Sequence, residues 1–357
     1  MFFQIVFADT EGLLCFIILT YSMSSVFCTK QTIKGGKQMT KTISKSPSKG
    51  PARAEGKMPF RLAFSRYWGL YAIVGVIMAY YLLFYYWPIV MGVMMAFKEV
   101  KLGMSVFNAP WVGVENFDYI FHDSEILRVT KNTLILSVLR LFWTFWPPIV
   151  LAIMIFDLTS AKYKRVCQTF VYIPHFFSWV IMYGIVFAFF SGNGMINNII
   201  AALGGRKQDF LMNSGLFRSL LVGSQVWKGT GWGTILYFAA LTNVNPELYE
   251  AAKIDGAGPV ARTRAVTLPA MMPVVTFSLI MSLGSILNND FEQVLMFYNS
   301  AVYSVGDIIE TWVYRVGLGK MQYSVGSAVS LLKAIISMVL IIGANAFSRK
   351  VAGRGMW

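Results

Sequence analysis

Long apolar stretches recur along the chain, and they limit most strongly what it can fold into. A helix needs about 20 mostly apolar residues to cross the roughly 30 Å of hydrocarbon in a bilayer. Only 13 % of the 357 residues are charged and 56 % are hydrophobic, which excludes a single soluble core. The stretches lack the ten-residue alternation of a membrane β-barrel. The sequence therefore predicts an all-α polytopic membrane protein. The six predicted spans are Tyr67–Phe97, Arg128–Phe156, Val166–Phe190, Leu216–Leu241, Pro269–Asn289 and Val325–Phe347.

The basic residues predict the orientation of these spans. Ten of the 31 Lys and Arg residues lie between Lys30 and Arg66, before the first span, and three more lie within Ala161–Val166. The alternate loops carry acids, such as Glu115 and Asp118. Lys and Arg favour the cytoplasmic side, so we expect a multi-pass cell-membrane protein with both ends of its six-span core in the cytoplasm. The net charge of +14 follows from this pattern and does not indicate a nucleic-acid partner.

The N-terminal extension, residues 1–57, differs from the permease-like remainder, residues 58–357. Residues 12–28 are apolar but marginal as a span, and residues 30–57 are rich in Lys, Ser and Gly. That composition is typical of a disordered tail attracted to the membrane surface. Two interpretations stay open. The extension contains a seventh helix, or the chain is over-extended and truly begins at Met39 or Met58.

A polar segment, residues 245–268, interrupts the apolar pattern between the fourth and fifth spans. Asn245 is a good helix N-cap, and Pro246 fits the first helical position. A short helix over Pro246–Ile254 is then broken by the sequence Asp-Gly-Ala-Gly, and Pro259 starts a second helix that we expect to run to Leu268. The segment is predicted to be a helix–turn–helix on the cytoplasmic face.

The polar segment, "EAAKIDGAGPVARTRAVTLPAMMP", resembles the EAA motif of ABC-importer permeases. The resemblance implies a six-helix type I ABC importer permease core, whose coupling helices dock onto a cytoplasmic ATPase. Stretches such as "YWPIVMGVMMAFK", "YIPHFFSWV" and "QVWKGTGWGTILYFAAL" extend the resemblance over about residues 60–357. They are most similar to the polysaccharide- and oligosaccharide-type, maltose-permease-like permeases of Firmicutes. The ATPase-coupling residues that the motif implies are Glu250, Ala251, Ala252, Asp255, Gly256, Ala257, Leu268 and Pro269.

The resemblance also implies the partners. These are a second, homologous permease, two ATPase subunits, and an extracytoplasmic, lipid-anchored binding protein that delivers an oligosaccharide. The chain itself has no G-x-x-x-x-G-K-S/T phosphate-binding loop and no catalytic motif, so we expect a non-catalytic transport subunit. We expect no cofactor on this chain, with ATP and Mg held by the partner ATPase. Three cysteines and two histidines form no metal-site spacing.

The substrate path is predicted from polar and aromatic residues inside or beside the spans. Sugars require hydrogen-bonding groups and aromatic faces, and ionisable residues within spans are costly unless they face a cavity or a partner. We expect glycines 229, 231 and 233 to break or kink the fourth span. The opposing interpretation is ordinary helix packing with interfacial Trp and Tyr anchors. The candidates are Gln225, Trp227, Lys228, Trp232, Tyr237, Asn288, Asn289, Asp290, Glu292 and Arg140.

Three alternatives to oligosaccharide import remain, and the first of them uses the same machinery. The same machinery would serve glycerol-3-phosphate or another small polar solute. An ion-coupled secondary transporter would need membrane-embedded acids and usually an inverted repeat, and a membrane enzyme or scaffold would need a catalytic set or a further domain. The sequence displays none of these features.

Overall fold

The computed structural model describes residues 60–352, which are helical apart from their connecting loops. The predictions for residues 1–57 lie outside this part of the chain. The described residues fall into two units that divide after Gly92. The first unit holds α3 (Phe60–Tyr81), the π-helix η1 (Leu82–Tyr86) and the start of α4 (Trp87–Ala96). Non-helical backbone at Tyr67 (φ −118°, ψ 22°) kinks α3, at the residue where the first span was predicted to begin.

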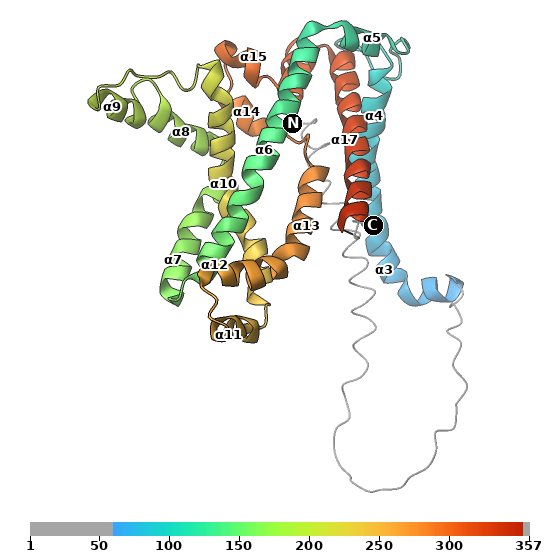
Figure 1. Ribbon diagram of the computed structural model, residues 1–357. Helices are drawn as coiled ribbons and strands as arrows, with labels where there is room; N and C mark the ends of the chain where they lie inside the picture. Colours follow the sequence, from blue (N-terminus) through green and yellow to red (C-terminus); the bar gives the residue numbers. More distant parts are fainter. Residues whose placement is uncertain (1–59, 353–357) are drawn as a thin grey trace, which may run out of the picture. The chain divides into compact units, whose positions relative to one another are not determined.

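The second unit begins with a capped helix pair. Helix α5 (Glu115–His122) is short, and α6 (Ser124–Asp157) is 34 residues long and contains the second predicted span. Asp123 caps α6, because its carboxylate accepts the backbone N–H groups of Glu125 at 2.6 Å and Ile126 at 3.4 Å. Helix α5 lies at one end of α6, and the chain turns after Asp157 at the other end (Figure 1).

The third predicted span, Val166–Phe190, is wrong as a single helix. The chain forms α7 (Ala161–Tyr172), a 3₁₀-helix η2 (Ile173–Phe176), α8 (Trp179–Phe190) and α9 (Met195–Ala202). Pro174 has no N–H for a helical bond, and Ser178 starts α8 by accepting the backbone N–H of Ile181 at 3.4 Å. The break between α7 and α8 follows from these two residues.

Helix α10 (Ser214–Thr242) contains the fourth predicted span and is continuous over 29 residues. The expected break at glycines 229, 231 and 233 is therefore wrong. Helix α10 is too polar in composition to be counted among the helices that are long and apolar enough to cross a membrane. Within the described residues, five such candidates are found: Phe64–Ala96, Ser124–Asp157, Trp179–Ala202, Pro259–Gly284 and Tyr323–Ala346.

The polar segment forms α11 (Pro246–Ile254) and α12 (Pro259–Arg262), which continues through the π-helix η3 (Thr263–Thr267) into α13 (Leu268–Gly284). The predicted boundary at Leu268 is thus absent. Pro269 has no N–H to bond four residues back, and the wider π turn accommodates the missing bond without ending the helix.

The C-terminal part consists of short helices followed by one long one. The short helices are α14 (Phe291–Phe297), η4 (Ser300–Val302), α15 (Tyr303–Gly306), α16 (Ile309–Trp312) and the π-helix η5 (Val313–Gly319). Helix α17 (Tyr323–Ala352) contains the sixth predicted span.

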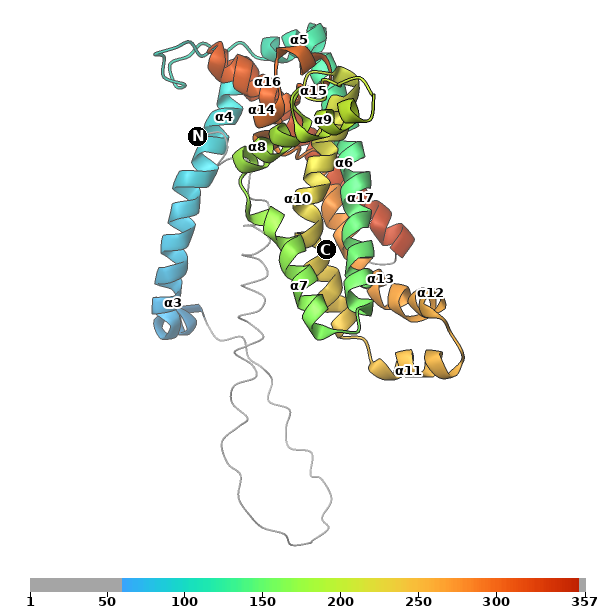
Figure 2. The same ribbon diagram turned by 90° about the vertical axis from the view of Figure 1, so that its left-hand side faces the viewer.

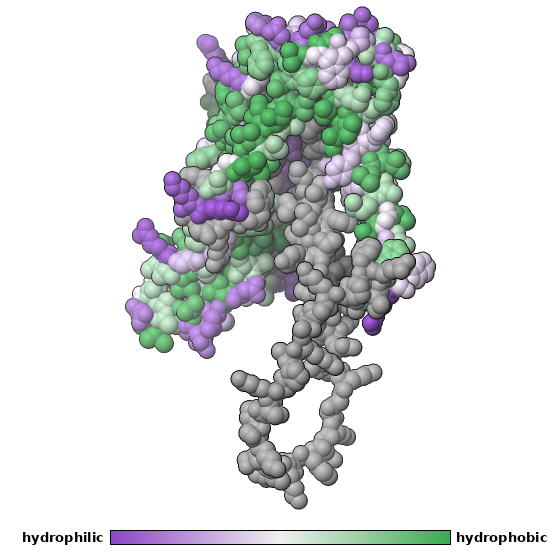
Figure 3. Space-filling view, turned by 90° about the vertical axis from the view of Figure 1, so that its right-hand side faces the viewer, coloured by the Kyte–Doolittle hydropathy of each residue, from purple (hydrophilic) through white to green (hydrophobic). Residues whose placement is uncertain are grey.

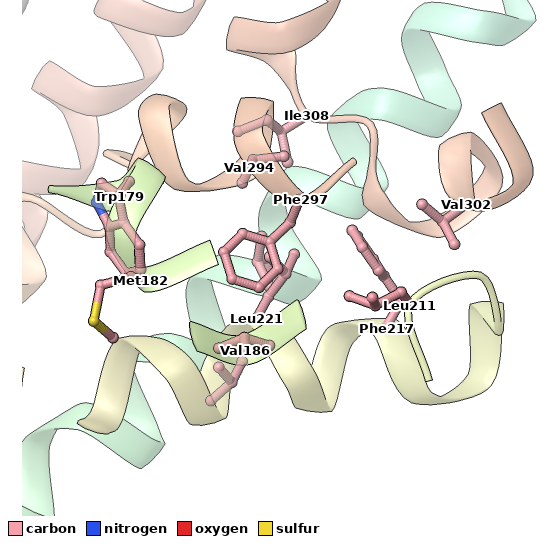
Figure 4. Close-up of a cluster of buried hydrophobic side chains, with 12 residues drawn as sticks. Trp179, Met182, Val186, Leu211, Phe217, Leu221, Val294, Phe297, Val302 and Ile308 are labelled. Carbon is pink, nitrogen blue, oxygen red and sulfur yellow. The ribbon is translucent and has the colours of Figure 1, made fainter. Parts of the chain in front are cut away.

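A buried cluster packs three helices of the second unit against one another. Trp179 and Met182 of α8, Phe217 and Leu221 of α10, and Phe297 of α14 meet in it (Figure 4). Between membrane helices, close packing of such side chains favours association through van der Waals contact. The cluster fixes α8, α10 and α14 against one another, and the polar residues considered below lie on the same helices.

The predicted cytoplasmic loops gather at one end of the second unit. Helices α7, α11 and α12 lie together at the lower end in two perpendicular views, whereas α5, α14 and α15 lie at the upper end (Figures 1 and 2). On the face drawn in Figure 3, hydrophobic residues form a broad band, and hydrophilic ones gather along the upper edge and on the projections below. This arrangement agrees with a membrane-embedded chain whose basic loops share one side.

Candidate functional site: an exposed helix pair and a polar network

The first candidate site is the helix pair α11–α12, and its local sequence explains its shape. Asn245 caps α11 by accepting the N–H of Glu247 at 3.1 Å, with Pro246 in the first turn. At the other end, Ala257 N–H donates to Ala252 O at 2.9 Å and Gly256 N–H donates to Lys253 O at 3.1 Å. This pairing is a Schellman motif, which requires a left-handed residue at Gly256. Its φ of +76° makes glycine the suitable residue there.

The helix pair presents apolar side chains to its surroundings. Ile254 is 86 % exposed and Val260 is 83 % exposed, on either side of the Gly256 turn. Of the predicted coupling residues, Glu250, Ala251, Asp255, Gly256, Leu268 and Pro269 are exposed, and Ala252 and Ala257 are half-buried. Exposed apolar residues rimmed by charged ones are typical of a protein-binding surface.

The second candidate site was predicted around Lys228, and the structure gives this side chain a different setting. Its ammonium donates to the carbonyl oxygens of His175 at 2.9 Å and Phe177 at 2.5 Å, and it lies 5.3 Å from the ring centre of Trp179. The sequence did not predict these carbonyl partners. Lys228 also interacts electrostatically with the acid Asp290. Lys228 satisfies the carbonyls that the α7–α8 break leaves without helical donors.

The aromatic candidates of α10 are divided between packing and exposed positions. Tyr237 is buried, and its hydroxyl lies 2.5 Å from Ser278 Oγ, so it packs α10 against α13. Trp232 stacks on His175 with ring centres 4.4 Å apart and planes 7° apart, yet remains 51 % exposed. Trp227 is 45 % exposed. Only the two tryptophans therefore keep a free aromatic face.

A buried polar network joins α6, α10 and α14. The Arg140 guanidinium donates to Gln293 Oε1, and the Gln293 amide donates to Leu221 O at 2.7 Å and Ser224 Oγ at 2.8 Å. The predicted candidate Asn289 donates to Thr133 O at 3.2 Å and Ser137 Oγ at 2.8 Å. The hydrogen bonds link the three helices in a low-dielectric interior. Arg140 Nε and Asn289 Oδ1 are buried without a hydrogen-bond partner among the described residues, so the network is only partly satisfied.

Four predicted residues relate to this network in different ways. Asp290 accepts the indole N–H of Trp179 at 2.8 Å and interacts electrostatically with Arg140. Asn288 and Glu292 are exposed, and neither side chain takes part in a hydrogen bond or ion pair among the described residues, although the Asn288 N–H donates to Ser285 O at 2.8 Å. Gln225 carries a buried Oε1 without a partner in the described part of the chain.

Sequence reasoning missed Gln293 and Ser224 as members of this network. Asn289 and Gln293 are four residues apart, a spacing that places two amides on one helix face. The sequence contains this four-residue spacing. However, Asn289 lies in the bend between α13 and α14, outside a continuous helix, so the helical period does not show that the two amides belong together. Lys333, an ionisable residue within α17, pairs with Glu310 of α16. Within residues 60–352, no group of three or more His, Cys, Asp or Glu side chains is placed to hold a metal ion.

Comparison with known proteins assigns the class. A family model described as "Binding-protein-dependent transport system inner membrane component" matches residues 58–354. Protein LplB of Bacillus subtilis (strain 168) is 40 % identical over 81 % of this chain and 91 % of its own length. The polygalacturonan/rhamnogalacturonan transport system permease protein YteP of the same organism is 36 % identical over 84 % of this chain and 93 % of its own length.

A solved structure is also similar over most of the chain. A bacterial alginate ABC transporter, in complex with an alginate pentasaccharide-bound periplasmic protein, contains a chain with a TM-score of 0.77 and 34 % identity. The match covers 84 % of this chain and all of that one. The helical fold and these matches define a membrane permease. The chain belongs to the family of binding-protein-dependent transport system inner membrane components and is the permease subunit of an ABC importer.

The contacts of Lys228 lead to a prediction about stability. Lys228→Met should remove the donor for two carbonyls and lower the free energy of unfolding by about 1–3 kcal/mol. Thermal unfolding of the purified permease in detergent would measure this loss. Lys131→Met is a suitable control, since Lys131 is exposed on α6 and should change the midpoint little. Equal midpoints for both variants and the unmodified chain would contradict the assignment of Lys228 to the helix break.

Proposed function

We propose that the chain is one of two related permease subunits in an ATP-driven importer of an oligosaccharide. An extracytoplasmic, lipid-anchored binding protein delivers the sugar, and two separate ATPase subunits hold ATP and Mg. This chain holds no cofactor and hydrolyses no ATP. Its six-span core has both ends in the cytoplasm. Its family relationship supports the class, and the names of its relatives, which include permeases for polysaccharide-derived substrates, support the substrate class.

The exposed helix pair α11–α12 is the single observation that carries the ATPase assignment. Two isolated apolar side chains, Ile254 and Val260, are more than four-fifths exposed at the end where the basic loops gather. An ATPase that covers them would bury apolar surface, and Glu250 beside them would meet a basic residue. The coupling surface in this proposal consists of Glu250, Ala251, Ala252, Asp255, Gly256, Ala257, Leu268 and Pro269.

Transport follows from alternating access. ATP binding shifts the permease between its inward-open and outward-open states only if the ATP-bound ATPase pair has different affinities for these two states of the permease. The docked helix pairs then move with the ATPases. Along the sugar path, Trp227 and Trp232 offer aromatic faces, and Asn288 and Glu292 offer exposed polar groups. Arg140, Asn289, Asp290, Lys228, Gln225 and Tyr237 support the path by holding the helices in place.

A charge reversal tests the docking surface. Glu250→Lys should reduce recovery of the ATPase with the affinity-tagged permease about tenfold or more, because a docked charge pair contributes several kcal/mol when one partner is reversed. Glu115→Lys is the matched control, since Glu115 is also exposed but lies on α5 at the other end of α6. Normal ATPase recovery and normal uptake in the Glu250 variant would remove this surface from the coupling mechanism.

The substrate class needs its own measurement. Import of glycerol-3-phosphate or another small polar solute is the alternative within the same machinery. Binding of a panel that contains acidic oligosaccharides, neutral oligosaccharides and glycerol-3-phosphate to the partner binding protein would distinguish them. We expect an oligosaccharide to bind most tightly. Preferred binding of glycerol-3-phosphate would overturn the oligosaccharide assignment but leave the importer class intact.

A further inference from the structure

One aromatic side chain connects helix α11 to the rest of the described chain. Tyr249 packs on Phe156 with ring centres 5.8 Å apart and planes at 43°, and its hydroxyl lies 3.3 Å from Thr267 Oγ1. Among the hydrogen bonds, ion pairs and ring contacts of residues 60–352, those of Tyr249 alone link α11 to the long helices. Helix α11 also contacts α12 and is joined to its neighbours in the chain by its two flanking turns.

Phe156 is itself held firmly where three helices end. It lies in the last turn of α6, and its ring is 6.3 Å from that of Phe238 on α10. The Lys164 ammonium of α7 donates to Phe156 O at 2.9 Å and lies 5.3 Å from the Phe156 ring centre. A cation over an aromatic face is attracted to it. Phe156 therefore gathers the ends of α6, α7 and α10 at one point.

The other partner of Tyr249 leads into a fourth helix. Thr267 is 1 % exposed and is the last residue of the π-helix η3, directly before α13. Tyr249 thus contacts α6 through its ring and the start of α13 through its hydroxyl. The residues in contact here are Tyr249, Phe156, Lys164, Phe238 and Thr267.

We propose that Tyr249 is the positioning residue through which movement of the docked helix α11 reaches the membrane helices. The inference rests on the proposed ATPase docking and adds the route by which docking acts. Without the ring, α11 would be joined to α10 and α12 by turns, one of which contains the left-handed Gly256, and by its contacts with α12. Such turns bend readily, so α11 could move with the ATPase while the membrane helices stay in place. A packed ring between two helices resists this independent motion.

Hydrogen–deuterium exchange of the assembled transporter tests the inference without requiring the sugar. The affinity-tagged chain is purified with the ATPase that accompanies it and is trapped with ATP and vanadate. In the unmodified transporter, trapping should change exchange both in α11 and in residues 290–312 at the opposite end. Tyr249→Ala should keep the change in α11 and reduce the change in residues 290–312 about fivefold or more, the lower end of typical coupling between sites.

Two further variants separate the ring from general destabilisation. Tyr249→Phe keeps the ring and loses only the hydroxyl, so it should restore the response in residues 290–312. Tyr249→Leu keeps apolar volume but has no ring, so it should show the same reduced response in residues 290–312. It replaces Tyr249→Ala in the test if the alanine variant does not fold. Transmission is disproved if the ring-free variants keep the full distal response, or if the unmodified transporter responds in α11 alone. Two other results would instead contradict the proposed docking. One is that no ATPase subunit purifies with the tagged chain, and the other is that trapping leaves exchange in α11 of the unmodified transporter unchanged.

Discussion

Gly231→Ala should sharply destabilise the permease. A Cβ atom built at Gly231 would overlap with the carbonyl oxygen of Val171 and lie 2.9 Å from its Cγ1. The backbone of α7 cannot move aside as a flexible side chain can, so the cost should be about 3 kcal/mol, the upper part of the range for overpacking. The thermal unfolding midpoint in detergent, followed with size-exclusion profiles, would measure this effect.

Gly229→Ala is the matched control for this variant. It lies two residues away in the same helix α10, and a Cβ there would have no atom within 4 Å. The control should be neutral or slightly stabilising, because alanine is the better helix former. Equal behaviour of the two variants would mean that α7 and α10 are not in close contact at Val171.

Gly256→Pro should abolish ATP-driven uptake while leaving the amount of inserted permease unchanged. Proline is fixed near φ −65°, whereas Gly256 has φ +76°, and its N–H donates to Lys253 O. The turn between α11 and α12 must therefore change direction, and the two apolar residues at its sides can no longer face one ATPase surface together. Uptake of the transported sugar into proteoliposomes, with permease quantified by immunoblot, is the measurement.

Gly258→Pro controls for the introduction of proline in the same turn. Gly258 already has φ −67° and ψ 172°, which suit proline and a residue that precedes Pro259. We expect uptake to be largely retained. If both proline variants transport normally, the geometry of this turn does not matter for coupling. If both fail equally, the left-handed conformation of Gly256 is not the reason.

The helix pair could be predicted closely from the sequence because its signals are local. An Asn–Pro start and a glycine stop act on neighbouring backbone groups, and the structure has α11 between them. The end of the second helix was missed because prolines at 269 and 273 look like breaks. The π turn at Thr263–Thr267 absorbs the bond that Pro269 cannot make.

The setting of Lys228 could not be predicted from its own surroundings in the sequence. An ammonium inside a span needs oxygen partners, and the sequence suggested water or an acid. Its hydrogen-bond partners are backbone carbonyls at the α7–α8 break, about 50 residues away in the chain, and the acid Asp290 interacts with it electrostatically. Predicting them requires knowing both that Pro174 breaks the third span and that the break faces α10.

The glycines of the fourth span illustrate the same limit. Glycine within a helix indicates either flexibility or close approach of another element, and the sequence does not distinguish these. In the structure, Gly231 contacts the backbone of α7, and a Cβ at Gly233 would meet the Pro148 ring of α6 at 3.0 Å. The glycines therefore permit packing of a continuous helix.

Photocrosslinking from Ile254 tests directly whether the helix pair α11–α12 docks onto an ATPase. A photoreactive phenylalanine analogue replaces Ile254 in the membranes of cells that express the whole transporter, and crosslinked products are identified by mass spectrometry. Leu203 is the control position, since it is 83 % exposed but follows α9 at the other end of the second unit. We predict a crosslink from position 254, and none from position 203, to a subunit with an ATP-binding P-loop. Failure to crosslink such a subunit from position 254, or equal crosslinking from position 203, would contradict docking of α11–α12 onto an ATPase.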